Sequence, residues 1–542
     1  MNRTHADEER LLAAPLPLTR AIAPYAIATL AGSTLWLWPH LVHFRQVPDR
    51  GDPIFSAWRL ARLAHQLATD PRHLFDGNIF YPLPLTLTYS DATILQGLLG
   101  APLIWLGVEP LIVSNLLFFL AFPACGLAFF YVAWQLTGDP KTAVVAGLLG
   151  AWYPFHSEHY SHLELQWFMF VPLALLAALR LLARPTLRTG LTLGVAVSAQ
   201  WLASMYIGLM LMTVLVPFAL ATAVGWRVRP SRALIRSWLA SIVVVLTVCV
   251  LTGLPYVKSR PARGDRTIEQ LWPGSATVSD YAATHRRLAS YRWHARGANQ
   301  PERELFPGAS PLFLGTIGAL TFGGAVPIAM TLAGALAFDG SLGLNGLTYR
   351  GLYDLGLPYR GLRVPARFSV LFGSCLILLG AFGAHVITRR GGTGTRNALF
   401  LIIVGLVLLD LRVTTPLVDY WPTAPTIYQQ VRSDMVLAEF PAGHDVDYMY
   451  FSTTHWARLI GGYTGFLPAD PEFDRARDTF PSPESLAWLR LRGATHLTYN
   501  CMFERSPERC VDTLQRLDRS PSLRLVAAAT WYGSDVRLYR FH

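Results

Sequence analysis

Residues 111–135 read LIVSNLLFFLAFPACGLAFFYVAWQ and carry no charged side chain. A helix rises about 1.5 Å per residue, so a run of this length can cross the hydrocarbon layer of a bilayer, which is roughly 30 Å thick. The stretch therefore predicts a transmembrane helix. Comparable apolar runs fill most of the chain up to residue 412. They lie at 21–43, 141–156, 166–184, 189–205, 207–226, 234–256, 308–338, 366–388 and 397–412.

The composition points to the same class of protein. Of the 542 residues, 52% are hydrophobic and 15% are charged, whereas about a quarter of the residues of a soluble domain are charged. This composition argues against a soluble multidomain enzyme. The formal net charge is +11, and the basic residues are spread through the connections between the apolar runs. That distribution disfavours nucleic acid as a partner and favours the phosphate groups of membrane lipids.

The charges of the connections set the expected topology. The run 308–338 is interrupted by Gly323 and Gly324, so it has room for two short helices. Two crossings there place the basic connection 389–396 on the same side as the tail 1–20, which we expect to be cytoplasmic. A single crossing would place that connection outside. The sequence thus predicts a polytopic α-helical membrane protein with about 11 transmembrane helices in residues 21–412, and with outer loops 44–110 and 257–306.

Residues 413–542 have a different character. Strand-like segments at 435–440, 493–499 and 523–531 alternate with helical segments at 482–492 and 510–517. This alternation predicts a small extracytoplasmic α/β domain. Cys501 and Cys510 lie together in it, and we expect them to form a disulfide in that oxidising compartment.

Carboxylates of the first outer loop are candidates for general acid–base chemistry. The loop contains Asp49, Asp52, Asp76 and Asp91. Asp52, with Asp91 second, is the candidate general base, because a carboxylate just above the bilayer can take a proton from an attacking hydroxyl group. A structural explanation competes for both. Asp52-Pro53 begins a helical pattern, as expected of an N-cap followed by Pro, and Asp91 likewise precedes a helical pattern.

A second cluster lies in the turn 153–167, YPFHSEHYSHLELQW. Glu158 and His162 are four residues apart, so they would share a face if the segment were helical, and both are candidate catalytic residues. His156, His159 and His162 could in principle bind a divalent ion. Their spacing of three residues rotates each about 60° from the last, so they converge poorly and we assign no metal ligand or cofactor. The alternative is a polar turn at the membrane interface, flanked by aromatic residues.

Basic residues at two membrane boundaries are candidates for phosphate binding. Guanidinium and ammonium groups can hold a phosphate and stabilise its charge as it leaves. Attraction to lipid head groups is the alternative explanation. These residues are Lys258, Arg260 and Arg263 after the run 234–256, and Arg363 just before and Arg367 at the beginning of the run 366–388.

Aromatic residues gather in STTHWARLIGGYTGF, residues 452–466, and just before it. Tyr450, Trp456 and Tyr463 could stack on sugar rings and are candidate glycan-binding residues. Packing in the core around the Gly461-Gly462 turn is the alternative.

The layout resembles the GT-C superfamily of membrane glycosyltransferases. Its elements are a first helix, an outer loop with an early acidic residue in GDPIFSAW, an apolar juxtamembrane stretch, a helical core and a C-terminal outer domain. The strings LFDGNIFYP, TYSD, HYSHLELQW and RVPARF are similar to those of a large set of bacterial multi-spanning proteins placed near that superfamily. The paired acidic residues of many members are absent, which leaves metal dependence open.

The resemblance implies a specific activity and location. Such an enzyme transfers a sugar from a polyprenyl-phosphate donor to an envelope glycan, lipid or protein acceptor on the outer face of the bacterial inner (plasma) membrane. Asp52 would be the general base, and the second outer-loop acid of some members would fall near Glu158 or Glu164. Two other classes remain open: a lipid flippase or transporter, and a non-catalytic envelope assembly or glycan-binding protein. Asp52→Asn separates catalysis from capping, because Asn keeps the capping ability and loses the base.

Overall fold

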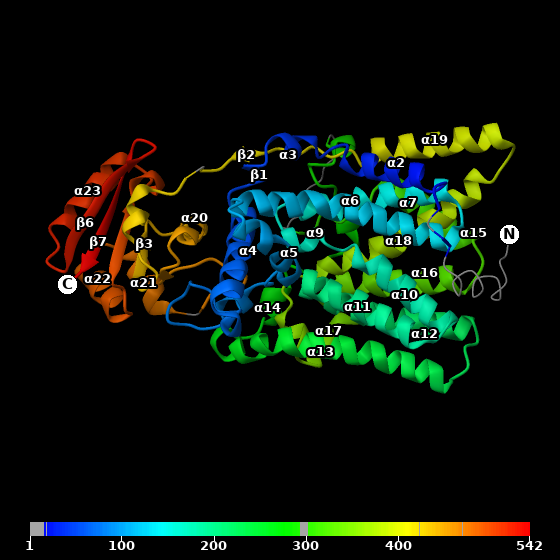
Figure 1. Cartoon of the computed structure of the whole chain (residues 1–542), viewed down its shortest axis with the longest axis horizontal. Coiled ribbons are helices and arrows are strands. Elements are labelled where there is room, and N and C mark those ends of the chain that lie inside the picture. The colour runs from blue at the N-terminus through cyan, green and yellow to red at the C-terminus, as the bar shows by residue number, and fades with distance from the viewer. Residues whose placement is uncertain (1–15, 18, 293–301, 422, 469) are drawn as a thin grey trace. The chain divides into compact units, whose positions relative to one another are not determined.

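The computed structural model describes residues 16–17, 19–292, 302–421, 423–468 and 470–542. Most of the predicted tail 1–20 lies outside these residues. The chain is mostly helical and divides into two compact units, whose elements are labelled in Figure 1. Unit 1 comprises Met1–His43, Leu116–Thr252 and Asp265–Leu417, and unit 2 comprises Phe44–Asn115, Gly253–Gly264 and Val418–His542.

Helices of 12 to 32 residues, together with the five-residue α3, follow the apolar runs of the sequence. They are α2 (Ala23–Thr34), α3 (Trp38–Val42), α6 (Pro110–Thr137), α7 (Pro140–Ala151), α10 (Phe170–Ala183), α11 (Leu187–Ala203), α12 (Met205–Gly225), α13 (Arg232–Arg263), α15 (Ala309–Thr321), α16 (Ala325–Ser341), α18 (Ser369–Thr388) and α19 (Thr393–Asp410). Shorter helices of unit 1 are α8 (Phe155–Glu158), α9 (Leu163–Gln166), α14 (Ile268–Leu271) and α17 (Tyr349–Asp354).

Among the described residues, five helical segments are long and apolar enough to cross a membrane: α6, α12, α13, Pro365–Thr388 with α18, and α19. The most apolar windows of α13 and α19 are each only 11% buried, so their side chains are available to lipid. The run 308–338 forms two helices, as expected, but α15 and α16 have 13 and 17 residues. The count of eleven spanning helices thus exceeds the five that reach spanning length.

Close backbone contact holds α15 against α18. A Cβ atom at Gly318 would overlap the carbonyl oxygen of Leu379, and one at Gly383 would overlap the carbonyl oxygen of Leu314. Small residues on both helices therefore permit an approach that any side chain would prevent, as in many packed membrane helices.

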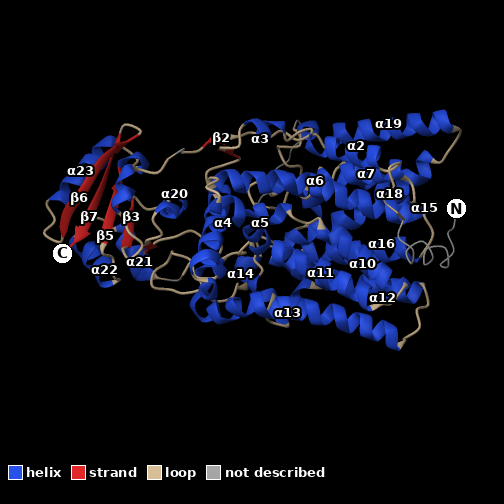
Figure 2. Ribbon diagram, in the orientation of Figure 1, coloured by secondary structure: helices blue, strands red, loops and turns tan. Residues whose placement is uncertain are grey.

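Unit 2 contains a five-stranded sheet, drawn in red in Figure 2. Its strands are β3 (Val436–Phe440), β4 (Arg458–Leu459), β5 (His496–Asn500), β6 (Leu523–Trp531) and β7 (Ser534–Phe541), in the order β4-β3-β5-β7-β6. β3 pairs in parallel with β4 and β5, and β7 pairs antiparallel with β5 and β6. The other strands and helices of unit 2 are β1 (Gln46–Val47), β2 (Val418–Asp419), α4 (Asp52–Thr69), α5 (Ile94–Trp105), α20 (Asp445–Phe451), α21 (Pro471–Asp478), α22 (Pro483–Leu491) and α23 (Pro507–Asp518).

The predicted strands are confirmed as β3, β5 and β6, and the predicted helices as α22 and α23. The pattern did not predict β7, which follows β6 after a tight turn. Cys501 and Cys510 are joined by a disulfide, with their Cα atoms 5.5 Å apart.

The domain boundaries differ from the predicted division at residue 413. Val47, Trp58 and Ile79 of the first loop share one buried core with Met449 and Leu538. The backbone is joined as well, because Asn78 O accepts a hydrogen bond from Leu459 N (2.7 Å) and Tyr81 N donates one to Leu459 O (2.9 Å). Residues 413–542 are therefore one part of a unit that also needs the first loop.

Candidate functional site

Two predicted site residues from distant parts of the chain meet in unit 2. The hydroxyl group of Tyr463 donates a hydrogen bond to Oδ1 of Asp52 at 3.1 Å. Asp52 is the first residue of α4, and the carbonyl of Gly51 accepts the first helical bonds from Ile54 and Phe55. Gly51 is therefore the N-cap, and the prediction of that role for Asp52 is wrong by one residue. Asp52 is half-buried and Tyr463 is 38% exposed, so this pair is accessible.

Contacts of both the backbone and the ring hold Tyr463 in place. Its backbone N–H points to Sδ of Met449 at 3.1 Å, and its ring packs edge-on against Phe55 with centroids 5.5 Å apart. The following residues are tied to the TYSD string, because Gly465 N donates to Ser90 Oγ (3.3 Å) and Phe466 N donates to Tyr89 O (2.8 Å). Phe55, Tyr89, Ser90, Met449 and Phe466 thus form a packed frame around Tyr463, and this frame directs its hydroxyl group at Asp52.

The same frame contains Asp91. Its carbonyl accepts a hydrogen bond from Arg59 Nη1 (2.6 Å), and its Oδ1 accepts one from Thr93 N (3.3 Å) just before α5. Tyr256 donates to the carbonyl of Ser90 at 3.1 Å. Asp91 therefore stabilises the turn before α5, which supports the structural explanation given for it above.

Of the predicted phosphate-binding residues, Arg263 contacts this frame. Its guanidinium group lies over the Phe466 ring, 4.5 Å from the centroid, and donates to the carbonyl of Tyr256 at 3.2 Å. Lys258 and Arg260 lie in the last turns of the same helix, α13, and Lys258 is exposed.

The other two predicted glycan-binding residues, Trp456 and Tyr450, make different contacts. Trp456 stacks on His65 with ring centroids 4.4 Å apart and adopts a φ of 55°, a left-handed backbone that large residues rarely take. Tyr450 is buried, and its hydroxyl group donates to Glu109 Oε1 at 3.3 Å. The prediction that Tyr450 binds glycan is therefore wrong, since its ring lies in the core.

A second cluster, in unit 1, is built around Glu302. Arg367 donates to both of its carboxylate oxygens, at 2.7 and 3.0 Å, and His159 Nε2 lies 3.2 Å from Oε2. Burial alone would raise the pKa of Glu302, but Arg367 and His159 hold it well below its ordinary value. Arg367 is thus committed to an internal ion pair, which corrects its predicted role in binding phosphate. Arg363 is 48% exposed, and its Nη2 lies 4.0 Å from Glu302.

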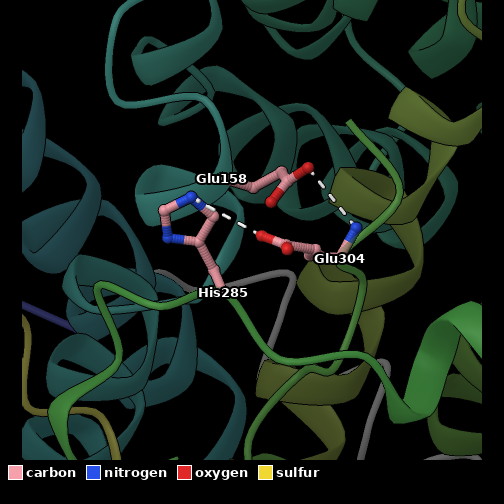
Figure 3. Close-up of side chains that lie close together, drawn as sticks. All are labelled: Glu158, His285 and Glu304. Atoms are coloured by element: carbon pink, nitrogen blue, oxygen red, sulfur yellow. Dashed lines mark hydrogen bonds and ion pairs between the residues drawn. The ribbon is translucent and has the colours of Figure 1, made fainter. Parts of the chain in front are cut away.

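Close to Glu302 lies a further group of side chains. They are Glu158, His285 and Glu304, which converge from three segments (Figure 3). Glu304 N lies 3.4 Å from Glu158 Oε1, and His285 Nε2 lies 3.6 Å from Glu304 Oε2. Burial, followed by the charge of Glu304, raises the pKa of Glu158 well above its ordinary value. One atom from each of the three side chains lies within 4.8 Å of the other two.

The predicted helical pairing of Glu158 with His162 is wrong. The helix α8 ends at Glu158, and the side chain of Gln166 donates to the carbonyls of His159 (2.5 Å) and His162 (3.3 Å), which holds the chain in a turn. His285 and Glu304 were not predicted, because they lie more than 120 residues away from Glu158 in a loop without periodic pattern. The only sequence signal was that one residue is a histidine and the other a glutamate, which are side chains that can bind a metal or transfer a proton.

A scan against protein-family models finds no match for this chain. A search of the curated proteins finds no match either.

Proposed function

We propose that the chain is an inverting membrane glycosyltransferase. It would transfer a sugar from a polyprenyl-phosphate donor to an envelope glycan, lipid or protein acceptor on the outer face of the bacterial plasma membrane. Five helices of spanning length support membrane insertion. The observation that carries the catalytic part is the hydrogen bond between Tyr463 and Asp52, because it holds an accessible carboxylate in one orientation.

In the proposed reaction Asp52 is the general base. Its carboxylate accepts the proton of the acceptor hydroxyl group while the hydroxyl oxygen attacks the anomeric carbon. The bond from the anomeric carbon to the phosphate oxygen breaks, and the lipid phosphate leaves with the electron pair. Attack from the opposite face inverts the anomeric configuration. Tyr463 is a positioning residue, since it touches the base.

Arg263 is the cation that this proposal assigns to the leaving phosphate. Its guanidinium group sits in the frame that carries the TYSD string and Phe466. A fixed guanidinium compensates the charge that develops on the phosphate without reorganising solvent. Lys258 and Arg260 on the same helix would add to the attraction for the anionic donor.

The test compares envelope glycans and glycolipids by mass spectrometry in cells with wild-type protein, Asp52→Asn, or no protein. Membrane abundance is matched between variants. We expect Asp52→Asn to lose a sugar from the envelope and to accumulate a polyprenyl-phosphate sugar, as the strain without the protein does. Asp70→Asn, at the other end of α4 and hydrogen-bonded to His73, is the matched control and should resemble wild type.

If Asp52→Asn matches wild type, the catalytic assignment is wrong. A non-catalytic glycan-binding protein would give that result.

A further inference from the structure

Glu158, His285 and Glu304 form a cluster that contains one imidazole and two carboxylates. Glu158 ends α8, while His285 and Glu304 lie in the loop segments on either side of residues 293–301. Figure 3 shows the three side chains converging from these segments. Three independent parts of the backbone therefore present potential ligand atoms to one place.

Glu158 provides the observation that points to a ligand. Its Oε2 is buried, and among the described residues it has no hydrogen-bond partner. A buried carboxylate oxygen without a donor is costly, because its hydration is lost and nothing replaces it. Nearby guanidinium groups are directed elsewhere: Arg367 pairs with Glu302, and Arg303 pairs with Asp280 at 2.7 Å.

The geometry suits a metal ion after small side-chain adjustments. Ligand atoms bound to one zinc ion at about 2.0–2.2 Å lie roughly 3–4 Å from one another in tetrahedral geometry. The atoms offered by the three side chains already lie within 4.8 Å of one another, and the Glu304 to His285 separation is 3.6 Å.

We infer that Glu158, His285 and Glu304 bind a divalent transition-metal ion, with zinc as the first candidate. An imidazole nitrogen together with two carboxylates favours Zn²⁺ or Mn²⁺ over Mg²⁺ and Ca²⁺, which take oxygen ligands. Three protein ligands leave a coordination position open, as in catalytic zinc sites. This site lies in unit 1 and does not depend on the proposed role of Asp52.

The test uses the full-length protein in detergent. Wild-type protein is stripped with EDTA, dialysed against ZnCl₂, MnCl₂ or MgCl₂, desalted, and analysed for bound metal by inductively coupled plasma mass spectrometry. We expect about one zinc ion per chain, a higher melting temperature in zinc than in magnesium, and weak retention of magnesium. Cobalt added to the stripped protein should give the visible absorption bands of a low-symmetry nitrogen–oxygen site.

Variants assign the ion to this cluster. Glu158→Gln, Glu304→Gln and His285→Asn should each weaken zinc binding at least tenfold, because each removes one ligand. Glu269→Gln, an exposed residue of α14, is the control and should bind zinc like wild type. Size-exclusion profiles identify variants that fail to fold.

Two results would overturn the inference. One is a wild-type protein that takes up neither zinc nor cobalt, which would mean that Glu158 and Glu304 share a proton instead. The other is a folded set of variants that retain zinc with wild-type affinity. Both are independent of the glycan analysis, so this inference can fail while the proposed function stands, and the reverse also holds.

Discussion

Tyr463 and Asp52 are separated by 411 residues, yet the tyrosine hydroxyl group lies 3.1 Å from the carboxylate. Tyr463→Phe keeps the ring against Phe55 and removes this hydrogen bond. A hydrogen bond to a charged group contributes about 1.5–3 kcal/mol, so we expect sugar transfer to fall by roughly 10- to 150-fold. The readout is the rate at which the wild-type glycan reappears after induced expression.

Tyr532→Phe is the control for that experiment, because Tyr532 is an exposed tyrosine in the β6–β7 turn of the same unit. It should transfer at the wild-type rate. Equal rates for Tyr463→Phe and wild type would mean that the hydroxyl group does not position the base.

Removing Arg367 from its ion pair with Glu302 should strongly destabilise unit 1. Arg367→Gln leaves a buried carboxylate without its guanidinium, a change that typically costs about 3–5 kcal/mol. Arg363→Gln removes a half-exposed cation whose closest approach to Glu302 is 4.0 Å, and exposed pairs contribute about 0–1 kcal/mol. Melting temperatures in detergent should therefore drop clearly for the first variant and little for the second. Similar drops for both would contradict the assignment of Arg367 to the interior.

Glu439 gives unit 2 a pH dependence. It lies on β3, where Tyr428 donates to its carboxylate at 3.0 Å and Thr498 also donates, and burial raises its pKa from 4.5 to about 7. The folded state therefore holds the proton more tightly than the unfolded state. Its contribution to stability is complete below about pH 4.5 and is lost as the pH rises through about 7, a change of about 3 kcal/mol.

Glu439→Gln should remove this slope and raise the melting temperature at pH 8 relative to wild type, with little change at pH 5. Glu484→Gln, an exposed residue at the start of α22, should keep the wild-type slope. A Glu439→Gln protein whose melting temperature falls with pH as steeply as wild type would assign the slope to other groups.

The contact between α15 and α18 predicts opposite effects for two chemically identical substitutions. Gly318→Ala places a methyl group on the carbonyl oxygen of Leu379 and should destabilise the protein by about 1–3 kcal/mol, as overpacking does. Gly405→Ala in α19 meets no atom within 4 Å and should be neutral or stabilise its helix by up to about 1 kcal/mol. Thermal unfolding of the two variants in the same detergent measures the difference. Equal melting temperatures would mean that the two helices can separate at no cost.

The sequence predicts most of the helices because spanning segments leave a local signal. Runs of apolar residues mark α6, α12, α13 and α19 directly, and Gly323-Gly324 marks the break between α15 and α16. The number of membrane crossings is harder to predict from the sequence. The length of an apolar run does not determine whether a run such as 21–43 forms one helix or divides into two, as it does into α2 and α3.

The candidate sites depend on contacts that no local pattern contains. Asp52 was recognisable as an acidic residue after the first helix, but its partner Tyr463 was proposed for sugar stacking instead. His285 and Glu304 were missed because nothing in their own neighbourhood distinguishes them. Residue chemistry can therefore be read locally, whereas the pairing of residues is set by the tertiary fold.

The edge of the sheet in unit 2 has a consequence for the order in which the protein is made. Residues 78–81 bond to β4, and the first loop shares its core with segments after residue 418. The ribosome makes the first loop roughly several hundred residues before the segments after residue 418. Until those segments are made, the apolar surfaces of Trp58 and Ile79 that pack against them are exposed. Unit 2 can fold only after the segments beyond residue 418 have been made, which makes the nascent chain dependent on the membrane or a chaperone to shield the loop until then.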